Sequence, residues 1–228
     1  MSIILSGHQP TYLPSLGLFA KMKDSDIFMH CGHLQYEDGS WQDRNRIQGV
    51  NGEFVSLRVP TKHTLGDSIR NVYLAPEWHR FPGGKTTKGV RDQHLKSMSH
   101  RYAKEPYFAN YYPGIAKILG SDFALLDTLC RSLTDQIAEW LGIKTRIIDS
   151  ANWHLGGDAI SKIIQMCQAV GADTYLSNSG AADYIGQVEE ERFREAGIKH
   201  AWINYADPDD VPLSVVHHLF MRGPDVLG

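Results

Sequence analysis

Short β-prone runs alternate along this chain with longer segments of helical periodicity, and this alternation restricts the possible folds most strongly. Strands are predicted at residues 3–6, 27–29, 145–149, 175–176 and 199–203, and helices at residues 16–24, 123–141, 159–167 and 188–196. Strands that alternate with helices form parallel sheets covered on both faces. The sequence therefore predicts an α/β fold in which one domain, residues 1–228, holds a mostly parallel sheet flanked by helices.

The region between the second and third of these strands has a different pattern. Residues 54–59 alternate with period two and stop at Pro60, which predicts a half-buried strand. Residues 34–41 turn at Asp38-Gly39, which indicates a hairpin, and residues 92–102 are helical in pattern. Residues 61–91 are rich in glycine, proline and basic side chains, and they predict an irregular surface loop or a lid.

Composition excludes several classes of function. Hydrophobic residues make up 42% of the 228 residues, enough for a conventional core, and the net charge of -3 gives no general attraction to nucleic acid. We find no basic leader segment and no apolar run near the roughly 20 residues that span a bilayer, so a cytoplasmic protein without a membrane span is expected. The widely spaced Cys31, Cys130 and Cys167 predict reduced thiols, the last two in the core.

Two polar motifs follow predicted strands. His8 comes directly after the first strand, where an imidazole can serve as a general base or as a hydrogen-bond donor, or can be purely structural. Residues 177–184 follow a later strand and are rich in small side chains, so their backbone can approach a phosphate or carboxylate, or can simply form a tight turn. The segment lacks the spacing of a nucleotide-binding loop.

Two further motifs precede the half-buried strand. Arg44-Asn45-Arg46 behind Trp41 supplies two guanidinium groups, an amide and an aromatic ring, which suit a phosphate, a carboxylate or a sugar, or form a solvated basic turn. Residues 30–33 read His-Cys-Gly-His, but on a strand the two histidines point to opposite faces, so no metal site is predicted. Cys31 as a nucleophile is a minor alternative.

Four blocks and the C-terminal segment together resemble the WbqC-like family. Residues 7–17 resemble its HQPxYLPWxG signature, and residues 34–47 resemble its VQF…W…RNRI block. Residues 94–108, 175–184 and 213–223 are similar to later blocks of the family in the same order. The resemblance covers nearly the whole chain, so one WbqC-like domain is expected.

The resemblance implies a function and a site. Family members occur in surface-polysaccharide gene clusters, such as those for O-antigen, and an aminoacyl transferase role has been proposed for some. The implied catalytic residues are His8, Arg44 and Arg46, with His8 as the base and the arginines stabilising an oxyanion. The implied substrate-binding residues are Gln9, Tyr12, Gln35, Trp41, Asn45, His94, Tyr102, Ser177, Gly180 and Tyr184.

This chain departs from the family pattern at several polar positions. Gly32 stands where an acidic residue is usual, and His217 and Met221 replace Asp and Asn in the last block. Two hypotheses follow. The first is an enzyme that transfers an aminoacyl group, glycyl for example, from an activated donor to a hydroxyl or amine of a sugar, nucleotide sugar or other small molecule in polysaccharide or specialised metabolite synthesis. The alternative is a non-catalytic module that binds a nucleotide or phosphosugar. No cofactor is predicted.

Overall fold

The computed structural model describes residues 2–81, 88–150, 153–183, 185–208 and 212–227. Its chain divides into two compact units, each made of several segments. Unit 1 contains Met1–His8, Gly17–Cys31 and Ile143–Pro208, and unit 2 contains Gln9–Leu16, Gly32–Gly142 and Asp209–Gly228.

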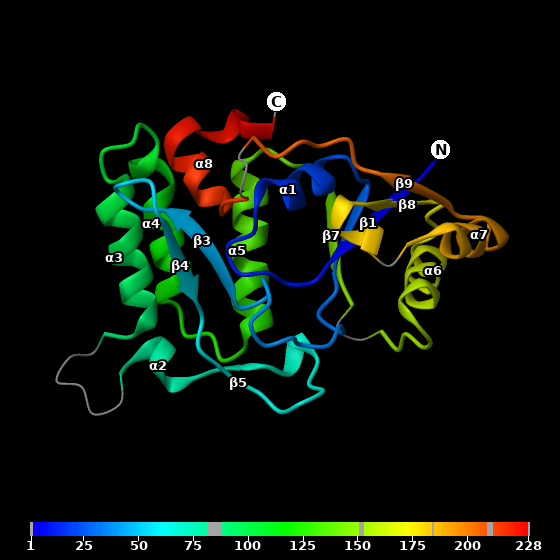
Figure 1. Cartoon of the computed structure of the whole chain (residues 1–228), viewed down its shortest axis with the longest axis horizontal. Helices are drawn as coiled ribbons and strands as arrows, with labels where there is room; N and C mark the ends of the chain where they lie inside the picture. The colour runs from blue at the N-terminus through cyan, green and yellow to red at the C-terminus, as the bar shows by residue number, and fades with distance from the viewer. Residues whose placement is uncertain (1, 82–87, 151–152, 184, 209–211, 228) are drawn as a thin grey trace. The chain divides into compact units, whose positions relative to one another are not determined.

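Unit 1 is built on a five-stranded parallel sheet with the order β7-β2-β1-β8-β9 (Figure 1). The strands are β1 (Ile4–His8), β2 (Ile27–His30), β7 (Arg146–Asp149), β8 (Thr174–Ser177) and β9 (Lys199–Trp202). Numbered along the chain within this sheet, the order is 3-2-1-4-5, as in doubly wound sheets of the Rossmann type. All four residues of β2 and of β8 are buried, as expected for central parallel strands.

Helices cover both faces of this sheet. Ser6 points toward the end of α1 (Leu16–Lys23), where its hydroxyl accepts a hydrogen bond from Ser25 at 2.7 Å. The next residue, Gly7, faces Met166 of α6 (Ala159–Val170) on the opposite face. Beside α6 packs α7 (Gln187–Glu195), and η2 (Ser179–Asp183) follows β8. The predicted α/β class, with a parallel sheet flanked by helices, is confirmed.

Unit 2 consists of helices and two small antiparallel sheets. One sheet pairs β3 (Arg44–Gln48) with β4 (Phe54–Arg58), and the other pairs β5 (Thr61–Lys62) with β6 (Tyr73–Leu74). The helices are α2 (Pro76–His79), α3 (Val90–Tyr102), α4 (Phe108–Gly120), α5 (Leu126–Trp140) and α8 (Val215–Arg222), with short 3-10 turns at η1 (Ile69–Asn71) and η3 (Pro224–Leu227). The core face of α5 is apolar at helical spacing: Leu126, Leu129, Leu133 and Ile137 are fully buried.

Local predictions in unit 2 had mixed outcomes. The predicted hairpin at residues 34–41 is wrong, because the strands that pair are β3 and β4, joined by a turn at residues 49–53. Asp38 is not part of a hairpin turn, and its carboxylate accepts a hydrogen bond from Arg58 at 2.6 Å. In the predicted loop, Ile69, Val72 and Trp78 are fully buried, while residues 82–87 lie outside the described part.

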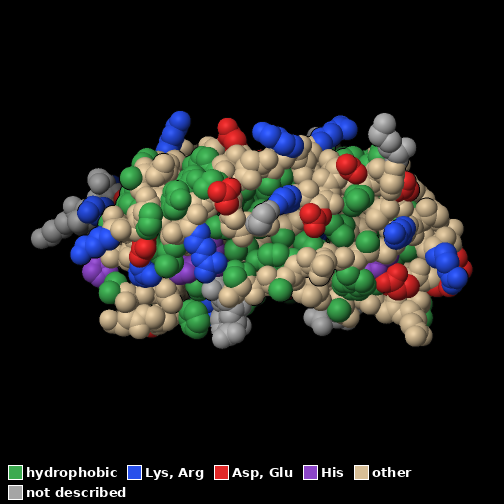
Figure 2. Space-filling model, turned by 90° about the horizontal axis from the view of Figure 1, so that it is seen from above, with side chains coloured by type: hydrophobic (Ala, Val, Ile, Leu, Met, Phe, Trp, Pro, Cys, Tyr) green, Lys and Arg blue, Asp and Glu red, His purple; other side chains and the backbone are tan. Residues whose placement is uncertain are grey.

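The described residues include no helix that is long and apolar enough to cross a membrane. Cys31, Cys130 and Cys167 are all free thiols and all buried. On the face shown in Figure 2, lysine and arginine side chains are interspersed with aspartate and glutamate. This mixture agrees with the nearly neutral net charge.

Candidate functional site

The sheet of unit 1 has a topological switch point between β1 and β8. From β1 the chain proceeds to β2 and then β7 on one side, whereas β8 leads to β9 on the other side. In open α/β sheets, ligands bind outside the carboxyl ends of the strands at such a point. His8 is the last residue of β1 and Ser177 is the last residue of β8, so two predicted site residues lie at this edge.

These two side chains leave the sheet on opposite faces. Leu5 pairs with Tyr175, and side chains alternate along each strand, so Ser177 points to the same face as Gly7. Consistent with this, the Tyr175 hydroxyl lies 3.5 Å from where a Cβ on Gly7 would be. His8 therefore points toward the face covered by α1, and Ser177 toward the face covered by α6 and α7.

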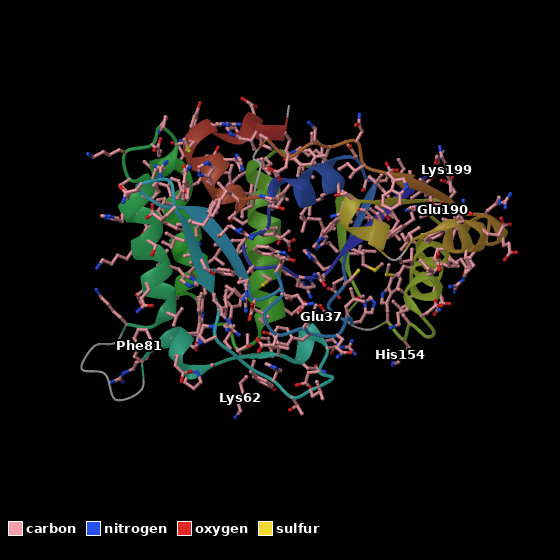
Figure 3. The ribbon with its side chains drawn as sticks, in the orientation of Figure 1. Glu37, Lys62, Phe81, His154, Glu190 and Lys199 are labelled. Carbon is pink, nitrogen blue, oxygen red and sulfur yellow. The ribbon has the colours of Figure 1, made fainter. Side chains whose placement is uncertain are left out.

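Ser177 is the first member of a hydrogen-bonded chain of three side chains. Its Oγ lies 2.9 Å from Nε2 of His200 on β9, and Nδ1 of His200 lies 2.6 Å from Oε1 of Glu190 on α7. Figure 3 shows Glu190 on α7, which packs beside β9. The His200 side chain is fully buried, whereas that of Glu190 is 42% exposed.

The carboxylate determines the direction of these hydrogen bonds. An ionised carboxylate only accepts, so Nδ1 of His200 carries the proton and donates to Glu190. In the neutral imidazole Nε2 is then an acceptor, to which the Ser177 hydroxyl donates. This is the arrangement by which a histidine removes a proton from a serine nucleophile, and it is recognised by geometry rather than by sequence position. The chain order serine, glutamate, histidine also occurs in α/β-hydrolases, an analogy at the level of the fold.

Aromatic rings hold the imidazole in place. Phe193 stacks on His200 with ring centroids 5.1 Å apart and an interplanar angle of 11°, and Trp202 meets it edge-on at 4.7 Å. An open hollow of about 820 Å³ between α7 and β9 is lined by Glu190, Trp202 and Lys199, among others. Glu190 and Lys199 are labelled in Figure 3. The imidazole thus has one orientation, which a catalytic base requires.

The turn after Ser177 supplies backbone donors. Within the described residues, the amide N–H groups of Asn178, Ser179 and Gly180 donate to no acceptor. In strand-to-helix nucleophile turns, the amide after the nucleophile is one donor that stabilises the oxyanion. This turn therefore places candidate oxyanion donors beside Ser177.

Unit 1 also contains a buried amine and a buried thiol near the end of β1. Nζ of Lys21 donates to the Gly7 carbonyl at 2.8 Å, and burial lowers the pKa of this amine to about 8. Burial raises the pKa of the Cys31 thiol to about 12, and Lys21 only partly offsets this. Because the thiol stays protonated at neutral pH, Cys31 is a poor candidate for a nucleophile.

Two predicted binding residues of unit 2 lie deep in its core. The Tyr12 hydroxyl is 2.9 Å from Nδ1 of His94, and Trp78 packs edge-on against both rings. Burial lowers the pKa of His94 to about 4 and raises that of Tyr12 well above its usual value. These fully or nearly fully buried groups stabilise unit 2 and are closed to solvent.

The polar positions at which the chain departs from the family pattern have partners in unit 2. Nδ1 of His217 lies 3.0 Å from the hydroxyl oxygen of Tyr102, which is fully buried and donates to the Gln48 carbonyl at 3.4 Å. A Cβ on Gly32 would lie 2.6 Å from Oδ1 of Asp127, so only glycine leaves room for this carboxylate. The place of the acidic side chain that is usual at residue 32 is therefore occupied by the carboxylate of Asp127 on α5.

The predicted amide side chains of unit 2 form structural hydrogen bonds. Gln42 is nearly fully buried, and its side-chain amide donates to Oε1 of Gln9 at 3.0 Å and to the backbone carbonyl of Gln35 at 3.3 Å. Asn45 donates to the carbonyl of Leu13 at 2.6 Å. Leu13 has a φ of 46°, rare outside glycine, so Asn45 holds a strained turn.

The two predicted catalytic arginines lie in different surroundings. Nε of Arg44 donates to the fully buried carboxylate of Asp43 at 3.0 Å, which also accepts from Arg58. The guanidinium of Arg46 instead lies over Trp41, 4.7 Å from the ring centroid, and 5.5 Å from that of Phe54. Arg44 is thus occupied by an internal ion pair, whereas Arg46 is held by aromatic rings.

The predicted site residues are distributed over both units. His8, Ser177 and Gly180 belong to unit 1, most of the others belong to unit 2, and Tyr184 lies outside the described residues. His200 and Glu190 were not predicted as site residues. Glu190 lies 13 and His200 lies 23 residues after Ser177 in the sequence, and they come near it only because β9 is the neighbour of β8 in the sheet. A histidine within an apolar strand was the one available signal.

The strand order and the polar groups at its switch point define the class of this protein: a doubly wound α/β protein with a hydrogen-bonded serine, histidine and glutamate at the end of β8. The sequence model of the WbqC-like protein family matches residues 9–224, so the chain belongs to this family. It is similar to the uncharacterized protein Rv1507c of Mycobacterium tuberculosis (strain ATCC 25618 / H37Rv), with 26% identity over 200 residues, which cover 86% of this chain and 80% of the relative. No solved structure matches it.

Proposed function

We propose that this protein is an acyltransferase that moves an aminoacyl group, with glycyl as the first candidate, from an activated donor to a hydroxyl or amine. The observation that carries the proposal is the hydrogen-bonded chain Ser177–His200–Glu190 at the carboxyl end of β8. The acceptor would be a sugar, a nucleotide sugar or another small molecule of polysaccharide or specialised metabolite synthesis. The reaction would take place in the cytoplasm without a cofactor.

The first half-reaction would transfer the acyl group to the protein. His200 takes the proton of the Ser177 hydroxyl as Oγ attacks the donor carbonyl, and the amides of Asn178 and Ser179 stabilise the oxyanion. The bond between the carbonyl carbon and the leaving group then breaks, and His200 gives the proton to the leaving group. Glu190 stabilises the imidazolium that forms between these steps.

The second half-reaction would return the serine to its starting state. His200 takes a proton from the acceptor hydroxyl or amine, which attacks the carbonyl carbon of acyl-Ser177. The bond to Oγ breaks and the proton returns to Oγ. Ser177 is 2% exposed, so the proposal includes a displacement of the turn at residues 178–183 when the donor binds.

The test is a mass-spectrometric assay with purified protein. Aminoacyl adenylates and aminoacyl thioesters are offered as donors, and amino sugars and nucleotide-linked amino sugars as acceptors. A mass-shifted product and, without acceptor, an acyl adduct on Ser177 are expected. Ser177→Ala and His200→Gln should each lower the rate by about 10³-fold or more, and Ser121→Ala, at an exposed serine of unit 2, should retain activity.

Other outcomes distinguish the remaining candidates. Transfer that survives Ser177→Ala but falls by about 10²-fold in His8→Ala would replace the serine mechanism with direct transfer that uses His8 as the base. Stabilisation by a nucleotide sugar without turnover of any donor would refute the transferase and favour a non-catalytic binding module. Thermal shift against a panel of nucleotide sugars measures this stabilisation.

A further inference from the structure

The solvent face of the β3–β4 hairpin carries three arginines with different electrostatic surroundings. On β3 the outward residues are Arg44, Arg46 and Gln48, and on β4 Arg58 lies opposite Arg44. Asp43 neutralises Arg44 and, together with Asp38, Arg58. Arg46 has no carboxylate partner within the described residues. Its positive charge is therefore available at the surface.

Two exposed aromatic rings hold the Arg46 guanidinium. Trp41 is 48% exposed and Phe54 is 52% exposed, and the guanidinium carbon lies 4.7 Å and 5.5 Å from their ring centroids. Cation–π attraction of this kind restricts the side chain without using any of its N–H groups. Among the described residues the Arg46 guanidinium donates no hydrogen bond. All five donors remain available to a ligand.

This combination is suited to one kind of ligand. A planar guanidinium with free donors binds phosphate or carboxylate oxygens in pairs, and its fixed orientation reduces the entropy lost on binding. The exposed parts of the Trp41 and Phe54 rings beside it offer apolar contact to a ring attached to the anion. Tryptophan and arginine are also residue types on which the binding energy of protein interfaces concentrates.

We propose that the Trp41–Arg46–Phe54 cluster is a binding site for an oxyanion, phosphate or carboxylate, carried by a small molecule whose ring rests against the two aromatic side chains. The Arg46 guanidinium makes the paired hydrogen bonds to the anion, and the rings set its orientation. The site lies within unit 2 and is independent of the acyl chemistry proposed for Ser177.

NMR titration of isotopically labelled full-length protein tests the site. Phenyl phosphate and benzoate present the two anions on the same ring, and neutral phenol presents the ring alone. At constant ionic strength, one or both anions should shift the Arg46 Nε–Hε and Trp41 indole resonances, and phenol should shift them much less. The more tightly bound anion identifies the source, phosphate or carboxylate.

Substitutions separate a built site from general charge attraction. Arg46→Gln should weaken binding by about 10-fold or more, since hydrogen bonds to charged groups are lost, and Arg46→Lys should weaken it by a smaller factor. Arg194→Gln removes the same charge from the exposed surface of α7 in unit 1 and should change affinity by less than about 2-fold. The proposal is refuted if neither anion shifts the Arg46 signal, or if Arg46→Gln and Arg194→Gln weaken binding equally.

Discussion

Single side chains in this protein carry protonation states that depend on burial. His94 is 5% exposed and its pKa is lowered to about 4, so the folded protein keeps the imidazole neutral where the unfolded chain, with a pKa near 6.5, binds a proton. Neutral His94 accepts from the Tyr12 hydroxyl through Nδ1. Between pH 4 and 6.5, folding is thus linked to the loss of a proton from His94.

This linkage predicts acid sensitivity with a defined sign. Because the folded pKa is depressed, the contribution is fully present above pH 6.5 and is lost as the pH falls toward 4, by up to about 3 kcal/mol. His94→Gln should lower stability at pH 7 and flatten the dependence between pH 6.5 and 4.5, measured by urea unfolding. His154 is exposed (Figure 3), so His154→Gln should leave the pH dependence of stability unchanged. An equally steep dependence in His94→Gln would contradict the assignment.

At the scale of elements, two glycines at helix ends have opposite conformational requirements. Gly171 follows the last residue of α6 with a φ of 70°, and its amide bonds back to the helix. Gly120 ends α4 with a helical backbone, and a Cβ there would meet open space. Only the first position needs glycine.

We expect Gly171→Ala to lower the free energy of unfolding by about 1 to 2 kcal/mol, because an L-residue is strained at positive φ. Gly120→Ala should be neutral or stabilising, since alanine restricts the unfolded chain and favours a helix. Thermal and urea unfolding of the two variants measure the difference. Equal effects would show that backbone conformation at Gly171 does not govern the end of α6.

The elements of unit 1 could be predicted from sequence more fully than those of unit 2. Short apolar, β-prone runs predict β1 and β2, and apolar residues at helical spacing before Gly171 predict α6. The helix α4 was not predicted, since it contains Pro113 and follows a run of polar and aromatic residues. The helix α8, with two buried histidines, also lacks a clean apolar stripe.

The candidate site was predictable only in part, for a physical reason. His8 and Ser177 each follow a strand, which is a local signal that the sequence displays. His200 and Glu190 come near Ser177 only because β8 pairs with β9 and α7 packs on β9. No local sequence pattern specifies this pairing or this packing. Likewise, Asp43 and not Arg44 is the buried member of its ion pair, a difference that depends on tertiary burial.

At the scale of the whole molecule, the two units share one interleaved chain. The chain passes between the units after residues 8, 16, 31, 142 and 208, so neither unit is a continuous segment. We propose that residues 1–228 behave as one domain that folds cooperatively. An interleaved path makes it difficult to keep one unit folded while the other is unfolded.

Native-state hydrogen exchange tests this proposal. Phe193 is fully buried in unit 1, and Phe193→Ala should lower the free energy of unfolding by about 3 to 5 kcal/mol. If folding is cooperative, the slowest amides of β1 in unit 1 and of α5 in unit 2 should lose the same amount of protection. Loss confined to unit 1 would show two separately folding units.

The neighbouring strands β2 and β7 are far apart in the chain. They pair from Ile27↔Arg146 to His30↔Asp149, although residues 31–145 separate them. The cost of closing so long a loop rises only slowly with its length, so equilibrium stability is little affected. Folding speed is more sensitive, because pairing of distant segments raises contact order and slows the search for the native topology. β7 therefore cannot pair with β2 until residues 31–145 have been synthesised, and this edge of β2 stays unpaired until then.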